Sequence, residues 1–227
     1  MKEPLLQGLI AAPFTPMNED CTIKTEAIPA YADFIAAKGC LKGVFICGTS
    51  GESVSLTLEE RKNIAEAWTN AAKGRFKVIV HVGGMSQPDC VELAAHAASV
   101  GADMIAAMAP GFFKPASVKD LVGFFKPVAA AAPELPFFYY NMPSITGVSL
   151  PVHEFLAEGK KDIPTLAGVK FTHNNLMEMQ QCINLNDGEF EVLNGFDEIL
   201  LAGVACGCKG AVGSTYNYIP GIYQGIL

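Results

Sequence analysis

The chain has 227 residues, of which 50% are hydrophobic and 17% are charged. This is enough apolar material for a large core, so the composition excludes disorder and predicts a single globular domain over residues 1–227. The formal net charge of −7 and the lack of a long basic run argue against nucleic acid or an anionic membrane as partner. A small anionic ligand would need positive charge gathered locally in one cleft.

No leader or membrane span is predicted, because the apolar stretch after Met1 is too short and no later one reaches about 18 residues. We therefore expect a cytoplasmic protein. The seven cysteines lack C-x-x-C spacing, and even the pair Cys206 and Cys208 offers too few ligands for structural zinc. Buried free thiols and no metal are expected. Three histidines likewise fit no ligand spacing: His81, His96 and His153.

Short apolar runs recur along the chain and predict buried strands. These runs are residues 8–12, 43–47, 77–82, 104–109, 136–140, 166–170, 190–194 and 210–214. Helical patterns lie between them. In the stretch 57–73, Ile64 and Trp68 share an apolar face, and Thr57 with Glu60 predicts a capping box at its start. Similar patterns cover residues 87–100, 118–131, 175–184 and 197–206.

Runs that are apolar throughout are typical of strands buried on both faces, and helices between them indicate parallel pairing. Eight such units predict an α/β fold, a (β/α)8 TIM barrel. A doubly wound open sheet is the alternative, but no Gly-x-Gly-x-x-Gly follows the first strand. A TIM barrel typically takes about 250 residues. This chain stops at Leu227, within the expected eighth helix at 219–227, so it is either a fragment, which we favour, or a barrel with an incomplete outer layer.

Three groups of polar residues follow predicted strands. Thr49 and Ser50 lie in a glycine-rich turn after the second strand, Tyr140 ends the fifth and Lys170 ends the sixth. Each has a plain structural interpretation: a helix N-cap, a core aromatic and a surface lysine. In a parallel barrel, however, the carboxyl ends of all strands meet at one mouth. Burial disfavours the charged form of an amine, so Lys170 could present a nucleophile there.

These strings, with Gly168-Val169-Lys170-Phe171-Thr172 as the lysine motif, resemble the class I aldolases of the N-acetylneuraminate lyase and dihydrodipicolinate synthase superfamily. The resemblance implies that Lys170 forms a Schiff base with a 2-keto acid and that Tyr140 relays a proton. It also implies that Thr49 and Ser50 bind the substrate carboxylate and that Thr172 contacts a sugar. The covalent imine would act as the electron sink, so no metal or organic cofactor is expected.

Further strings bear on the substrate. Dihydrodipicolinate synthases typically carry an arginine where this chain has Ile145, and isoleucine cannot bind an anion. Two other strings resemble those of sialic acid lyases that hold a polyhydroxylated tail; their candidate substrate-binding residues are Gly195, Asp197, Glu198, Gly213 and Ser214. Charge at a helix N-terminus is the structural alternative for the two carboxylates. Weaker candidates, left out of the catalytic set, are His173, Phe112 and Phe113.

The resemblance thus implies reversible retro-aldol cleavage of N-acetylneuraminate to pyruvate and N-acetylmannosamine. It also implies a homotetramer, and it implies that the chain lacks the family's C-terminal helices. Two alternatives stay open. One is another pyruvate-dependent aldolase acting on a different aldehyde, and the other is a sugar-binding barrel without catalysis.

Overall fold

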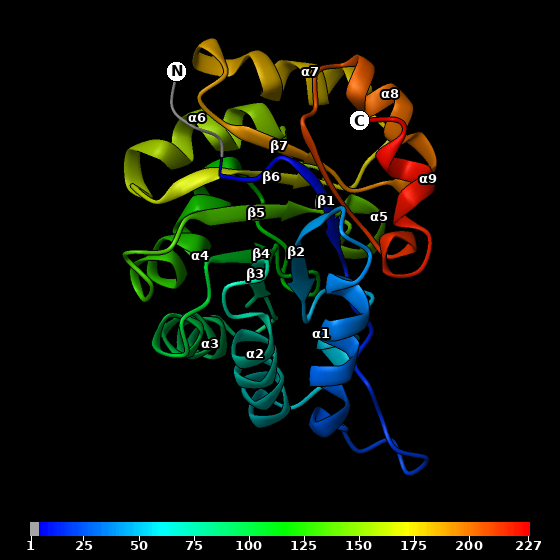
Figure 1. Ribbon diagram of the computed structural model, residues 1–227. Coiled ribbons are helices and arrows are strands. Elements are labelled where there is room, and N and C mark those ends of the chain that lie inside the picture. The colour runs from blue at the N-terminus through cyan, green and yellow to red at the C-terminus, as the bar shows by residue number, and fades with distance from the viewer. Residues whose placement is uncertain (1–4) are drawn as a thin grey trace.

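The computed structural model describes residues 5–227, and its strands form a closed barrel in which each strand pairs in parallel with its neighbours in chain order. Figure 1 shows the strands at the centre and the helices outside them. The strands are β1 (Gly8–Ala11), β2 (Leu41–Ile46), β3 (Lys77–His81), β4 (Met104–Met108), β5 (Phe137–Asn141), β6 (Leu166–Phe171), β7 (Glu191–Asn194) and β8 (Gly210–Gly213). The predicted TIM barrel is confirmed, and the open sheet is excluded because β1 also pairs with β8.

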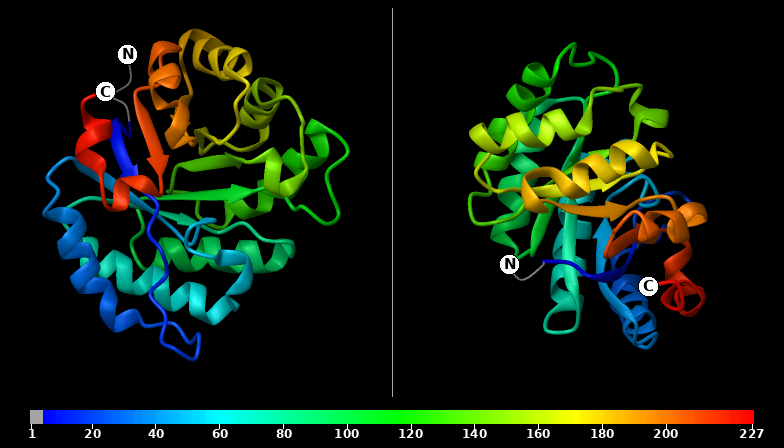
Figure 2. Two further views of the ribbon diagram at one scale, coloured as in Figure 1. Left: turned by 90° about the vertical axis from the view of Figure 1, so that its right-hand side faces the viewer. Right: turned by 90° about the horizontal axis from the view of Figure 1, so that it is seen from above.

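Helices cover the outside of this barrel, as both views in Figure 2 show. They are α1 (Ile28–Ala36), α2 (Leu58–Ala72), α3 (Gln87–Ser99), α4 (Val118–Ala130), α5 (Pro143–Thr146), α6 (Val152–Asp162), α7 (Leu176–Asn184), α8 (Leu200–Ala205) and α9 (Pro220–Gln224). The sequence patterns did not predict α1, α5 or α6. They also placed the start of α8 too early, because residues 197–199 form a separate 3-10 turn, η4 (Asp197–Ile199).

The uniformly apolar strands are explained by two separate cores. Alternate residues of β5 show this: Phe138 and Tyr140 point into the barrel with Phe45 and Leu193, whereas the neighbours of Phe138 pack outward against the helices. A strand with apolar side chains on both faces buries them in both cores. Because this burial removes apolar surface from water, it stabilises the strand between the two cores.

Local capping also agrees with the sequence. The Thr57 hydroxyl accepts from the backbone N–H of Glu60 at 3.3 Å, and the Glu60 carboxylate accepts from the backbone N–H of Thr57 at 2.8 Å. The predicted capping box therefore begins α2. It fixes the first turn of a helix whose buried face carries Arg61 and Trp68.

Two negative findings concern the described residues. None of the helices within residues 5–227 is long and apolar enough to cross a membrane. In the same part of the chain, no three side chains among His, Cys, Asp and Glu gather closely enough to hold a metal ion.

Candidate active site

Lys170 projects into the interior of the barrel. In β6 its neighbours Val169 and Phe171 pack outward, so the alternation of a strand turns Lys170 to the opposite face. Its side chain is only 4% exposed. The Nζ atom lies 4.1 Å from the centre of the Phe45 ring and 4.0 Å from the centre of the Tyr140 ring. Aromatic faces attract cations, so the two rings form a cation–π environment around this atom.

Tyr140 lies directly beside Lys170, because the two residues are Cα partners in the β5–β6 pairing. The Tyr140 hydroxyl forms a hydrogen bond of 3.1 Å with the Thr49 hydroxyl. It also donates to the sulfur of Met142 at 3.2 Å. Three strands therefore bring a lysine, a phenol and a threonine hydroxyl together at the carboxyl end of the barrel, as the sequence predicted.

The turn after β2 presents Thr49 and Ser50. Cys47 begins it in the left-handed region at φ 52°, and Glu52 ends it at φ 58°. Non-glycine residues occupy this region at a cost, so other contacts must hold the turn in place. Within it, the Glu52 N–H donates to the Thr49 carbonyl at 3.0 Å. Thr49 is exposed and Ser50 is half-buried.

A second group of predicted residues lies after β6 and β7. Thr172 is 4% exposed, and among the described residues its Oγ1 has no hydrogen-bond partner. A Cβ placed on Gly195 would lie 2.0 Å from that oxygen. Gly195 is therefore required here because the Thr172 hydroxyl occupies the space that any side chain would take. An unpaired buried hydroxyl of this kind suits a ligand that supplies the missing hydrogen bond.

Asp197 is held by the segment after β8. Its Oδ2 accepts from the Thr215 backbone N–H at 3.0 Å and from the Thr215 hydroxyl at 2.7 Å. Its Oδ1 is buried and has no partner among residues 5–227. A Cβ on Gly213 would come within 1.6 Å of Oδ1, so the carboxylate fills the place of that side chain. The residue beyond, Ser214, is half-buried.

Glu198 differs from its neighbour Asp197. It is exposed on η4, and no hydrogen bond or ion pair joins it to the other predicted residues within the described part of the chain. The structure thus brings Lys170, Tyr140 and Thr49 into contact, and it joins Asp197 to the segment after β8. Glu198 shares only the end of the barrel with them.

Several residues that contact this site were not in the predicted set. Phe45 contacts Lys170 and the Tyr140 ring, Met142 accepts from the Tyr140 hydroxyl, and Thr215 donates to Asp197. Phe45 lies within a predicted strand, and Thr215 directly follows two predicted residues. The side-chain alternation of a strand could have indicated Phe45. The bond between Thr215 and Asp197 joins residues 18 positions apart and has no sequence signal.

His81 is another residue to which the sequence assigned no role. It is 1% exposed, and its Nδ1 lies 2.8 Å from the Cys47 carbonyl oxygen. Its Nε2 accepts from the Met108 backbone N–H at 3.2 Å. Burial, and then the charge of Arg61, holds the pKa of His81 well below 6.5, so the ring is neutral near pH 7. By contrast His173, a weaker candidate, is only half-buried after β6.

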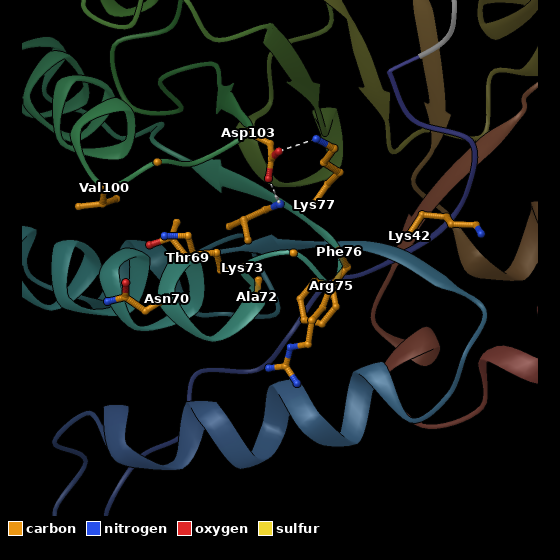
Figure 3. Close-up of a pocket in the computed structure, with 13 residues that line it drawn as sticks. Lys42, Thr69, Asn70, Ala72, Lys73, Arg75, Phe76, Lys77, Val100 and Asp103 are labelled. Carbon is orange, nitrogen blue, oxygen red and sulfur yellow. Dashed lines mark hydrogen bonds and ion pairs between the residues drawn. The ribbon is translucent and has the colours of Figure 1, made fainter.

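Two cavities lie at the other end of the barrel. One, of about 610 Å³, surrounds the start of β3, where Lys77 forms an ion pair of 2.7 Å with Asp103 (Figure 3). The other, of about 580 Å³, includes Leu166 and Gly210, the first residues of β6 and β8. Both are at amino ends of strands, so neither coincides with the group around Lys170.

Comparison with known proteins agrees with this geometry. The model of the dihydrodipicolinate synthetase family matches residues 5–227, and the chain belongs to that family. Among the relatives it is similar to, N-acetylneuraminate lyase A of Xenopus laevis is 48% identical over 215 residues, covering 94% of this chain and 70% of that protein. N-acetylneuraminate lyase of Gallus gallus is 46% identical over 216 residues, with the same coverage of both chains.

A solved structure is also similar. The N-acetylneuraminate lyase (sialic acid aldolase) of Aliivibrio salmonicida superposes with a TM-score of 0.95 at 43% identity, covering 99% of this chain and 74% of that chain. The superfamily resemblance that the motifs indicated is therefore confirmed.

Proposed function

We propose that this chain is a class I aldolase that cleaves N-acetylneuraminate reversibly to pyruvate and N-acetylmannosamine. The observation that carries the proposal is the contact of the buried Lys170 amine with the Tyr140 ring, next to the Thr49 hydroxyl. The similarity to N-acetylneuraminate lyases supports the choice of substrate.

The reaction begins when the Lys170 amine adds to the C2 carbonyl of the substrate and water is lost, leaving a protonated imine. The positive charge then resides on the nitrogen that lies 4.1 Å from the Phe45 ring centre. Interaction with that ring and with Tyr140 stabilises the iminium, because Lys170 is buried and water screens its charge little. The imine supplies the electron sink, so we propose that neither a metal nor an organic cofactor takes part.

Cleavage requires removal of the proton from the C4 hydroxyl. As the C3–C4 bond breaks, its electrons move toward the iminium, giving an enamine and releasing the aldehyde. Tyr140 is the proposed proton relay. Its hydroxyl is hydrogen-bonded to the Thr49 hydroxyl, and we assign Thr49 with Ser50 to the binding of the substrate carboxylate. A phenol is a weak base near pH 7, so the substrate carboxylate is expected to assist the transfer. Protonation of the enamine and hydrolysis then release pyruvate and restore the lysine.

The sugar tail is assigned to the second group. Thr172 offers an unpaired buried hydroxyl and Asp197 an unpaired buried carboxylate oxygen, both suited to hydroxyl groups of a substrate. We include Gly195, Gly213, Ser214 and Glu198 in this subsite, Glu198 at its exposed edge. We further propose a cytoplasmic homotetramer that binds only small molecules.

Ile145 bears on the substrate as well. It is 60% exposed on α5, at the position where the resemblance implied an arginine in dihydrodipicolinate synthases. An apolar side chain at position 145 cannot itself supply a cation for the carboxylate of a semialdehyde. This observation favours an uncharged aldehyde such as N-acetylmannosamine.

The test has two arms. Borohydride reduction in the presence of pyruvate, followed by peptide mass spectrometry, is expected to place a pyruvyl adduct on Lys170, and Lys170→Met serves as the matched control. Absence of an adduct in the unaltered protein would support a sugar-binding barrel without catalysis. Cleavage of N-acetylneuraminate is then measured against a panel of 2-keto acids. Turnover of another compound without turnover of N-acetylneuraminate would assign a different aldolase.

A further inference from the structure

A chain of buried polar contacts reaches the substrate-binding turn from outside the barrel. Arg61 of α2 is 7% exposed, and its Nη2 donates to the His81 backbone carbonyl at 2.7 Å. The His81 ring then contacts the Cys47 carbonyl, one residue before Gly48 and two before Thr49. The contacts thus run from helix α2 through strand β3 to the turn after β2.

The hydrogen bonds determine the tautomer of His81. Because Nε2 accepts from the Met108 N–H, the ring proton is on Nδ1, and Nδ1 donates to the Cys47 carbonyl. Both ring nitrogens are therefore engaged by backbone groups. His81 has no free nitrogen with which to exchange a proton with substrate, which excludes it as a general acid or base although its ring lies 5.7 Å from that of Tyr140.

The hydrogen bond from His81 reaches the backbone at Cys47, a residue with a strained conformation. Cys47 has φ 52°, a conformation that costs a non-glycine residue about 1 kcal/mol or more. Its thiol is not a competing functional group, because burial raises its pKa to about 11 and keeps it protonated. The nearby Phe45 contacts Lys170 and precedes Cys47 by two residues. A shift of the turn would therefore displace Thr49 relative to the lysine.

Arg61 shows that this arrangement is maintained at a cost. Its guanidinium is buried, none of the ion pairs among the described residues involves it, and its Nε has no hydrogen-bond partner there. A buried cation without a paired carboxylate destabilises a fold unless the hydrogen bonds it donates compensate. Here Arg61 donates a hydrogen bond to the backbone carbonyl of His81, and the His81 ring in turn donates to the Cys47 carbonyl of the turn.

We propose that His81 and Arg61 are positioning residues that hold the Cys47–Ser50 turn in the geometry that binds the carboxylate of the keto acid. The proposal rests on the proposed function for the identity of the ligand. Its structural content, that the Nδ1–H of His81 holds the turn, is independent of any activity.

Two substitutions at one position separate the two bonds of the ring. In His81→Asn, the side-chain amide nitrogen can take the place of Nδ1 and keep the bond to the Cys47 carbonyl. In His81→Gln, the side-chain amide oxygen can take the place of Nε2 and keep the bond from the Met108 N–H. Both variants lose the imidazole ring. If His81 serves only to pack the core, the two variants should therefore affect the turn and the KM for pyruvate similarly. If His81 positions the turn, His81→Gln should affect both more than His81→Asn.

The first readout is steady-state kinetics in the direction of synthesis, with pyruvate varied. We expect His81→Gln to raise KM for pyruvate about five- to tenfold, the effect of one lost hydrogen bond, with a smaller change in kcat. His81→Asn should stay within about twofold of the unaltered protein. Arg61→Met should raise KM in the same direction and Arg61→Lys should partly restore it. Arg75→Met, at the exposed arginine that bonds Asp33, is the control and should change neither constant.

The second readout needs no activity. Hydrogen exchange of the Glu52 amide, which donates to the Thr49 carbonyl inside the turn, should be faster in His81→Gln than in His81→Asn. Equal exchange and equal KM in the two variants would overturn the positioning role. If the unaltered protein forms no pyruvyl adduct on Lys170, the proposed function and the carboxylate assignment fail together. The exchange comparison then still decides whether His81 holds the turn.

Discussion

Gly213→Ala tests whether the space beside Asp197 is as full as the structure shows. The new Cβ would lie 1.6 Å from Oδ1, 2.4 Å from Cγ and 2.6 Å from Oδ2 of Asp197. All atoms of the carboxyl group are thus too close, so the side chain must turn away. In doing so it gives up the bonds of 3.0 and 2.7 Å from Thr215.

The magnitude follows from those two hydrogen bonds. A hydrogen bond to a charged group contributes about 1.5–3 kcal/mol, and Thr215 is half-buried, so water replaces only part of the loss. The stabilisation that alanine brings by restricting the unfolded chain is about 0.4–1 kcal/mol. We therefore expect Gly213→Ala to lower the free energy of unfolding by about 2–4 kcal/mol.

Urea denaturation followed by circular dichroism measures this loss. Gly123→Ala is the matched control, because nothing lies within 4 Å of the added Cβ inside helix α4. That change should stabilise the protein by about 0.5–1 kcal/mol, the difference in helix propensity. In an Asp197→Ala background the cost of Gly213→Ala should shrink, since the two residues contact each other.

Kinetics provide the functional half of the test. Displacement of Asp197 should raise KM for N-acetylneuraminate about tenfold or more, while borohydride still traps pyruvate on Lys170 because that part of the site is intact. If Gly213→Ala keeps both the stability and the KM of the unaltered protein, the reasoning about the carboxylate is refuted.

Three further predictions concern the interior of the barrel. Tyr140→Phe should lower kcat for N-acetylneuraminate cleavage about 10²- to 10⁴-fold while pyruvate is still trapped on Lys170, and an unchanged kcat would exclude the proton relay. Phe45→Leu should reduce the yield of the trapped adduct several-fold at limiting pyruvate, because the iminium loses an aromatic face. Phe138→Leu, in the same interior core, is the packing control and should leave the yield of the adduct unchanged. Burial holds the pKa of His81 below 6.5, so the unfolded chain binds a proton that the folded chain does not, and stability is lost as the pH falls through 6.5. Between about pH 7.5 and about pH 5.5 the free energy of unfolding, measured by urea denaturation, should fall by about 1.4 kcal/mol more in the unaltered protein than in His81→Asn. An equal fall in both proteins would mean that His81 titrates normally when folded.

Much of the fold and part of the site could be read from local sequence. Short apolar runs predicted the bounds of the barrel strands to within a few residues, and Thr57 with Glu60 predicted the start of α2. Both signals act over a few residues, where the chain itself fixes the geometry. Lys170 and Tyr140 were found in the same way, because a polar group that ends an apolar strand is visible without knowing its neighbours.

The tertiary structure alone decided which side chains meet. Strand register places Tyr140 against Lys170, and barrel closure puts Phe45 beneath the same amine. The contacts of His81 with residues of β4 and of the turn after β2 likewise join positions 27 and 34 apart in the chain. No spacing rule encodes such contacts, because the distance between strands depends on how the sheet closes. The sequence by itself determined the strands, most of the helices and the reactive groups, and the closed barrel determined their partners.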